Sequence, residues 1–245
     1  MPDRPLPYAL PPVELLDEVG STNDEAHRRA AAGERGPIWI ATRRQTAGKG
    51  RSGRAWVEAS EGNVAATLLF APSCPPARLP ELSLVAGVAT YDAVAEALAG
   101  SRAGRVELKW PILIESGTYG GTLMSLVGIG INVASAPDVS DRAVTSLSAR
   151  GSSLAAREVL DLLVAHTEHW LATWEAADGF AAIRTAWAAR AIPLGRPLEI
   201  KTQDGPVAGA FAGLDDDGAL LIDLPLTGRR RFTFGDVTVL PSERA

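Results

Sequence analysis

The chain has 245 residues, 46% of them hydrophobic and 22% charged, which is typical of a globular protein with one large domain or a large and a small one. A formal net charge of −5 argues against a dedicated nucleic-acid-binding protein, which normally carries a basic excess. No apolar run reaches the roughly 18 residues of a membrane-spanning helix, and the proline-rich start, MPDRPLP, lacks the apolar run of a signal peptide.

In chain order, the hydrophobic pattern first predicts strands and helices that alternate. Ser21 or Thr22 can cap the first helix, which has acidic residues in its first turn, arginines later and an end near Gly33. Strands are predicted at 13–16, 38–43, 63–70, 106–110 and 124–133, and helices at 79–98, 154–174 and 180–190. This order predicts an α+β fold, a mixed sheet with helices on one side.

After Ala191 the pattern changes to short strands separated by turn signals such as Asp204-Gly205 and Asp217-Gly218. The candidates are 198–202, 207–214, 219–224, 230–234 and 237–240. Five short strands within about fifty residues predict a small β-barrel. We therefore expect a first domain over residues 1–191 and a second over 192–245.

The most conspicuous motif is RQTAGKGRSGRAW at residues 44–56, between two predicted strands. Its glycines allow the backbone N–H groups to approach a ligand closely, and Lys49, Arg51 and Arg54 add positive charge. Such a loop is suited to binding an anion, although no G-x-x-x-x-G-K-[ST] phosphate loop occurs. A solvated glycine–arginine turn is the alternative.

Four segments in this order resemble the biotin protein ligases: Ser21-Thr22-Asn23, Gln45-Thr46 with the loop that ends at Trp56, Leu108-Lys109-Trp110-Pro111, and Gly128-Ile129-Gly130-Ile131-Asn132-Val133. Gly62-Asn63 is a weaker fifth match, and the segments span most of residues 13–135. The resemblance implies a class II synthetase-like catalytic domain followed by an SH3-like domain. Because only a dozen residues precede Val13, we expect the ligase-only form, without the helix-turn-helix domain of larger members.

The resemblance implies an ATP-dependent ligase that converts biotin and Mg-ATP to biotinyl-5'-adenylate and pyrophosphate. A lysine of a biotin carboxyl carrier protein domain, in acetyl-CoA or acyl-CoA carboxylase, then receives the biotin. ATP and Mg²⁺ are the implied cofactors, and no nucleic-acid or membrane partner is expected. The single cysteine, Cys74, excludes a disulfide framework and fits a cytoplasmic location.

The resemblance also assigns roles to residues. Arg51 and Arg54 would contact the biotin carboxylate or the adenylate phosphate, and Trp56 would stack on adenine. Ser21, Thr22 and Gln45 match the ureido-binding positions, while Asn132 matches an asparagine that contacts adenylate or metal. The candidate catalytic residues are Arg51, Arg54 and Lys109; the candidate binding residues are Ser21, Thr22, Asn23, Gln45, Gly48, Lys49, Gly50, Arg51, Arg54, Trp56, Lys109, Gly128, Gly130 and Asn132; and no residue is assigned to a metal.

Structural roles are alternatives for several of these residues. The Ser21-Thr22-Asn23 segment can be only a helix cap, Trp56 a core residue, and the glycines at 128 and 130 a β-bulge. Lys49 stands where the family usually has arginine, so it keeps the charge but loses the bidentate fork.

One departure from the family follows Pro111. Family members continue from Lys-Trp-Pro into Asn-Asp, a turn, a catalytic lysine and a Gly-Ile-Leu-x-Glu strand, whereas here Pro111 joins directly to Ile112. The only lysines are Lys49, Lys109 and Lys201, and none lies where the catalytic lysine belongs. Either the sequence omits a loop of about a dozen residues, or the protein has lost a hairpin.

Two rival functions remain. A lipoate or octanoate ligase belongs to the same superfamily, and a biotin-binding protein without catalysis would explain the missing lysine. Other features have simpler interpretations: His166 and His169 as a surface helix face without a third metal ligand, Asp215–Gly218 as a hairpin turn, and Arg229–Arg231 as an exposed strand.

Overall fold

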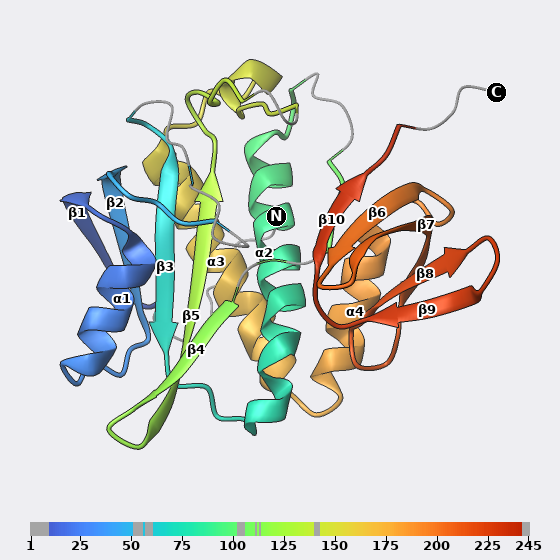
Figure 1. Ribbon diagram of the computed structural model, residues 1–245. Coiled ribbons are helices and arrows are strands. Elements are labelled where there is room, and N and C mark those ends of the chain that lie inside the picture. Colours follow the sequence, from blue (N-terminus) through green and yellow to red (C-terminus); the bar gives the residue numbers. More distant parts are fainter. Residues whose placement is uncertain are drawn as a thin grey trace.

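A computed structural model describes residues 10–50, 56, 61–101, 106–110, 112, 114–139 and 143–241. Its first sheet has five strands: β1 (Val13–Val19), β2 (Ile38–Gln45), β3 (Val64–Phe70), β4 (Ile114–Tyr119) and β5 (Thr122–Ile131). Their order is β1-β2-β3-β5-β4 (Figure 1). The β1–β2 pair is parallel and the others are antiparallel, so the sheet is mixed as predicted.

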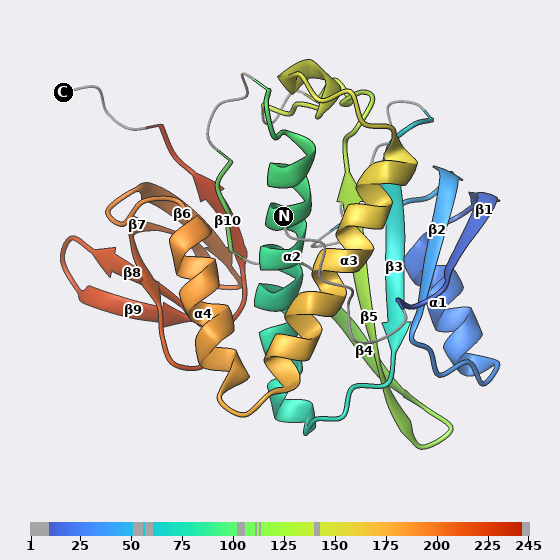
Figure 2. The same cartoon turned by 180° about the vertical axis from the view of Figure 1, so that it is seen from behind.

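Helices cover both faces of this sheet. The helix α1 (Thr22–Ala31) packs on one face, where Ala26 and Ala30 join Ile40, Leu69, Met124 and Leu126 in a small core. The longer α2 (Leu82–Ala97) and α3 (Ala156–Glu175) share the other face (Figures 1 and 2). The prediction that helices lie on one side of the sheet is therefore wrong for α1. Short 3₁₀ helices, η2 (Pro76–Glu81) and η3 (Ser148–Arg150), precede α2 and α3.

The central strand β3 is buried along its whole length. Its sequence, VAATLLF, is apolar except for Thr67, which is fully buried. A strand covered on both faces is expected to be apolar throughout, so a hydroxyl at its centre needs a hydrogen-bond partner. The partners of Thr67 lie on α1, and they locate the candidate site described below.

The second sheet comprises β6 (Pro197–Thr202), β7 (Gly205–Leu214), β8 (Leu220–Leu224), β9 (Gly228–Phe232) and β10 (Asp236–Val239). These strands are antiparallel in the order β10-β6-β7-β8-β9, which confirms the five short strands predicted after Ala191. The helix α4 (Gly179–Arg190) leads into this sheet, and the Trp187 and Phe211 rings pack edge to face with centroids 6.2 Å apart. The domain boundary at residue 191 stays a prediction.

One predicted strand is wrong. Residues 106–110 form a single bridge, between Leu108 and Ala191, instead of a strand of the first sheet. The backbone of Leu108 bonds to the end of α4, through its N–H to Arg190 O (2.8 Å) and its carbonyl to Ile192 N (3.0 Å). A strand forms only where another strand offers free backbone groups, and this segment pairs instead with the chain that leaves α4.

Candidate active site

A layer of hydrogen-bonded polar side chains lies between α1 and the sheet. The Thr67 hydroxyl of β3 donates to Asn23 Oδ1 (2.6 Å) and lies 2.9 Å from the Thr22 hydroxyl. The Thr22 N–H donates to Gln45 Oε1 at the end of β2 (2.9 Å). Thr22 and Gln45, which lie in two separate sequence motifs, are thus brought together, with Asn23 beside them. Thr22 and Asn23 are buried, so their polar groups are fixed before a ligand binds.

Gly128 of β5 provides the space for this layer. A Cβ at position 128 would lie 2.4 Å from Asn23 Oδ1, so a side chain there would displace the asparagine. The pairing of β3 with β5 runs in regular register through Thr67↔Gly128 and Ala65↔Gly130, which overturns the β-bulge alternative. The glycines therefore leave room for two side chains, Asn23 and Trp56, and their role in ligand binding stays a prediction.

Gly130 lies two residues farther along the same strand, and Trp56 packs against it. A Cβ at Gly130 would come within 2.5 Å of the Trp56 ring, so the indole lies directly against the strand. The Trp56 N–H donates to Gly48 O (2.8 Å), which joins the two ends of the glycine loop. Trp56 is only half-buried and lines a cavity, so the core alternative does not describe it.

The cavity beside Trp56 has a volume of about 410 Å³. Its walls come from α2 (Thr90, Val94, Leu98), the end of β5 (Gly130, Ile131, Asn132) and the segment Thr145, Ser146, Leu147 and Arg150, with Val106 at one side. Apolar and polar side chains line the cavity in about equal number, and Thr90 Oγ1 is buried without a hydrogen-bond partner in the described structure. A cavity with this mixed lining suits a flat ring that carries polar edges.

The loop cations are described only in part. Lys49 is exposed, and its Nζ forms an ion pair with Asp24 Oδ1 at the start of α1 (2.7 Å). The hydrogen bond from Lys49 to Asp24 raises the pKa of the lysine, which keeps its positive charge beside the polar layer. Gly50 is described as well, but Arg51 and Arg54, the predicted anion-binding arginines, lie outside the described residues.

The other predicted site residues lie around these two centres. Ser21 is the N-cap residue of α1, although its side chain makes no capping hydrogen bond. Asn132 lines the cavity and donates from Nδ2 to Thr145 O (3.2 Å). Lys109 is exposed on a segment held by α4 and by the second sheet, where Trp110 Nε1 donates to Gly218 O (3.2 Å). The predicted catalytic role of Lys109 stays a prediction.

Sequence reasoning missed Thr67, Thr90 and Glu115, which belong to the site or support it. Thr67 had a recognisable signal, because it is the only polar residue in an otherwise apolar strand. Glu115 stands at the glutamate of the Gly-Ile-Leu-x-Glu strand that the family resemblance places after the junction, but nothing in the sequence gives its partner. Its Oε2 accepts from Asn23 Nδ2 (3.0 Å), a residue 92 positions earlier in the chain. Such a contact depends on the folded register of β4 against β5.

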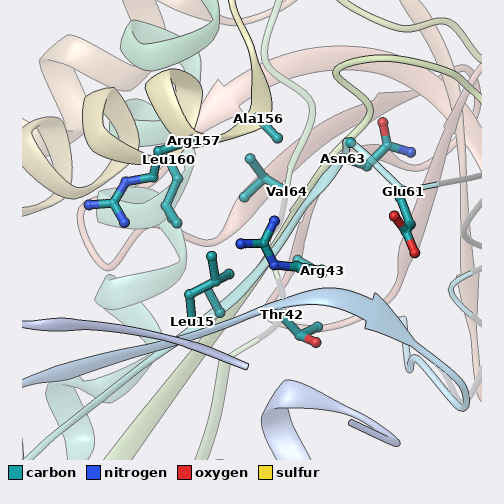
Figure 3. A pocket seen from close by; sticks show the side chains of 12 residues that line it. Leu15, Thr42, Arg43, Glu61, Asn63, Val64, Ala156, Arg157 and Leu160 are labelled. Atoms are coloured by element: carbon teal, nitrogen blue, oxygen red, sulfur yellow. The ribbon is translucent and has the colours of Figure 1, made fainter. Parts of the chain in front are cut away.

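A separate hollow of about 170 Å³ lies on the opposite face of the sheet, beside the start of α3 (Figure 3). Leu15, Val64 and Leu160 contribute apolar surface to it. The two arginines that line it already have carboxylate partners, Arg43 with Asp17 (3.4 Å) and Arg157 with Asp161 (3.0 Å). None of the predicted site residues lines this hollow.

Comparison with known proteins gives two family matches. Residues 19–134 match the biotin/lipoate A/B protein ligase family, and residues 194–240 match the biotin protein ligase C-terminal domain. Over 230 residues the chain is 39% identical to the biotin–[acetyl-CoA-carboxylase] ligase of Paracoccus denitrificans, covering 86% of this chain and 94% of that protein. The chain belongs to the biotin protein ligase family.

Two further relatives match this biotin protein ligase homologue at 30% identity. It is 30% identical to the biotin–[acetyl-CoA-carboxylase] ligase of Mycobacterium tuberculosis, over 86% of this chain and 83% of that one. It is also 30% identical to the bifunctional ligase/repressor BirA of Bacillus subtilis, over 84% of this chain and 68% of that protein. The fold matches the biotin protein ligase of Aquifex aeolicus in complex with biotin and ATP, with a TM-score of 0.73 at 23% identity, over 94% of this chain and 99% of that one.

Proposed function

We propose that this protein is an ATP-dependent biotin protein ligase that forms biotinyl-5'-adenylate and transfers biotin to a lysine of a carboxylase carrier domain. The observation that carries the proposal is the spacing of two centres along β5. Gly128 lies under the polar layer, and Gly130 lies under Trp56 and its cavity. Residues i and i+2 of a strand point to the same face, about 7 Å apart, so an acyl group and a nucleotide would meet there.

The polar layer supports a ureido ring as the acyl-site ligand. Thr22, Asn23, Thr67 and Gln45 contribute neutral hydroxyl and amide groups, which suit the N–H donors and carbonyl acceptor of a ureido group. The dithiolane ring of lipoate and the alkyl chain of octanoate have no such groups and would leave this layer unsatisfied. The site therefore favours biotin over the two rival acids.

The cavity beside Trp56 supports a purine base as the other ligand. The indole and the apolar side chains of Val94, Leu98 and Leu147 can pack against the ring. Asn132 and Thr145, which also line the cavity, can offer polar groups to the ring edge. The described residues contain no group of three or more metal-binding side chains. We infer that Mg²⁺ would be held chiefly by the phosphates of ATP and by water, as it commonly is in nucleotide sites.

In this reaction the protein chiefly positions the reactants and neutralises negative charge. A carboxylate oxygen of biotin attacks the α-phosphorus of ATP, a new O–P bond forms and pyrophosphate leaves. Lys49, Arg51 and Arg54 of the glycine loop would offset the negative charge that develops. In the second step, the neutral amine of a carrier lysine attacks the acyl carbon of the mixed anhydride, and AMP leaves as the amide forms.

The test is biotin-dependent exchange between ATP and labelled pyrophosphate, with lipoate and octanoate as controls, followed by transfer to a carrier domain. Exchange with biotin alone, and a carrier lysine that becomes biotinylated, are the expected results. Biotin binding without exchange would show that the direct junction after Pro111 has removed the chemistry and left a binding protein. Exchange with lipoate or octanoate instead of biotin would contradict the proposed substrate.

A further inference from the structure

A second group of polar side chains supports the site from outside. The Glu115 carboxylate at the start of β4 accepts hydrogen bonds at Oε2 from Asn23 Nδ2 (3.0 Å) and from His27 Nε2 (2.9 Å). The other ring nitrogen of His27, Nδ1, is hydrogen-bonded to the Tyr119 hydroxyl at the end of β4. His27 and Asn23 lie one turn apart on α1, so this cluster joins α1 to β4 beside the polar layer.

The carboxylate fixes the orientation of the Asn23 amide. An ionised carboxylate only accepts hydrogen bonds, so the group that Asn23 turns toward Glu115 must be its NH₂. The opposite orientation would place two oxygens against each other. The amide oxygen of Asn23 therefore points to Thr67 and must receive the proton of that hydroxyl, over 2.6 Å.

This orientation determines the hydrogen-bond direction of the next two hydroxyls. Each threonine has one hydroxyl proton. Because the Thr67 proton is donated to Asn23, Thr67 can only accept from Thr22, whose oxygen is 2.9 Å away. Gln45 Oε1 is a more distant acceptor at 3.3 Å and already receives the Thr22 N–H, so the Thr22 proton is donated to Thr67 and the Thr22 oxygen offers only lone pairs to a ligand. With the Asn23 amide turned round, Thr67 would donate to Thr22 instead, and Thr22 could then donate its own proton to a ligand.

We propose that Glu115 is a positioning residue that makes Thr22 a hydrogen-bond acceptor, and so selects a ligand with an N–H donor, such as a ureido group. This inference rests on the proposed function. His27 supports it by donating to the same carboxylate oxygen, and Tyr119 holds the other side of the imidazole. Glu115 has no contact with the ligand in this proposal and acts through Asn23 and Thr67.

The test replaces Glu115 with glutamine, which keeps the shape but can turn either an oxygen or an NH₂ toward Asn23. Both amide orientations then become available, and Thr22 is an acceptor in only part of the molecules. We expect the Kd for biotin, measured by calorimetry, to rise about tenfold in E115Q while the Kd for ATP changes less than twofold. A matched control is E96Q, because Glu96 and His166 form the same kind of pair (2.9 Å) between α2 and α3; it should leave biotin affinity unchanged.

A double-mutant cycle with T22V separates positioning from general loosening of the site. If Glu115 acts through the Thr22 hydroxyl, E115Q has less than a twofold effect on biotin affinity once that hydroxyl is absent. Independent effects that multiply in the double variant would overturn the inference. H27Q keeps the Glu115 carboxylate but removes the imidazole that donates to it, and it should raise the Kd for biotin about threefold. If E115Q does not fold, this variant tests the inference in its place, and an unchanged Kd in H27Q would overturn it.

The outcomes also separate this inference from the proposed function. If the unaltered protein fails to bind biotin, the proposed function fails and the inference fails with it. If the unaltered protein binds biotin and both E115Q and H27Q bind it equally well, only the inference fails.

Discussion

At the scale of single residues, two glycines on one strand mark the two proposed ligand sites, Gly128 the site for biotin and Gly130 the site for ATP. A methyl group at position 128 would meet Asn23 Oδ1, and one at position 130 would meet the Trp56 ring. Both contacts would be shorter than 3.0 Å, so the neighbouring side chain must move. Replacing either glycine by alanine adds the same methyl group, so any difference between the two variants in biotin and ATP affinity must come from the side chain that each methyl group displaces.

We predict that Gly128→Ala weakens biotin binding at least tenfold with a smaller change in ATP binding, and that Gly130→Ala does the reverse. The physical reason is that each methyl group displaces one recognition side chain, Asn23 or Trp56. Calorimetric titration of each variant with each ligand provides the measurement. Gly20→Ala, where φ is not positive and no atom lies within 4 Å of the Cβ position, is the matched control for substitution at a glycine. Equal losses for both ligands in both variants would contradict separate sites.

A second residue-scale prediction concerns Glu168 on α3. Burial, with a smaller contribution from nearby Glu175, raises the pKa of Glu168 to about 7. The unfolded chain releases this proton near pH 4.5, so between pH 4.5 and 7 the folded state holds more protons than the unfolded state. This carboxyl therefore lowers stability as the pH rises through that range.

Glu168→Gln should remove that pH dependence. At pH 8 we expect the free energy of unfolding to increase by about 1–2 kcal/mol, a value reduced from the full linkage because the side chain keeps partial access to water. Near pH 4 the substitution should have little effect, since the glutamate is then protonated in both states. Denaturant unfolding at the two pH values measures the difference, and a gain of equal size at both would be inconsistent with the raised pKa.

At the scale of elements, the sequence predicts most of the first sheet and all of the second because their strands carry local patterns. Residues 106–110 have such a pattern too, yet Leu108 bonds to the end of α4. The hydrophobic pattern of a sequence indicates which residues prefer an extended backbone. Whether those residues join a sheet depends on whether a partner strand is available. The same limit applies to the site: Ser21-Thr22-Asn23 and Gln45 were found as motifs, but their contacts with Thr67 and Glu115 depend on packing between distant elements.

The same segment supports a prediction about Trp110, a buried residue of the Lys-Trp-Pro motif. Its indole N–H donates to Gly218 O in the β7–β8 turn, and that turn packs so closely that a Cβ at Gly218 would lie 2.9 Å from both Leu84 and Phe180. Trp110→Phe removes the donor and leaves a carbonyl unsatisfied, which should cost about 1–2 kcal/mol of stability.

The matched control is Trp170→Phe, which removes the indole bond to Asp92 Oδ2 (2.9 Å) between α3 and α2. Both variants should lower the midpoint of denaturant unfolding. Only Trp110→Phe should also lower biotin-dependent pyrophosphate exchange, because it releases the segment that carries Lys109. Equal exchange rates in the two variants would show that this segment does not serve the reaction.

At the scale of the whole molecule, the two sheets share one hydrophobic core. Leu198, Ile200 and Phe211 of the second sheet belong to the same buried cluster as residues of α2, α3 and α4. Arg184 of α4 adds polar links to the β7–β8 turn, through Asp215 O (3.0 Å) and Asp216 Oδ1 (2.6 Å). The sequence changes character at residue 191, but the packing is continuous across that point. We infer two structural units that unfold as one.

Phe211→Ala tests this continuity, because all six tryptophans precede residue 192 while Phe211 lies in the second sheet. Removal of a buried phenylalanine ring typically costs about 3–5 kcal/mol. If the core is shared, the substitution lowers the midpoint of the tryptophan-fluorescence transition and that of the far-ultraviolet circular dichroism transition by the same amount. If the units unfold separately, the fluorescence transition stays near its original midpoint and a second, earlier transition appears in the dichroism alone. The Trp187–Phe211 contact favours the first result, because removal of the Phe211 ring takes away a direct packing partner of Trp187, whose fluorescence is one of those measured.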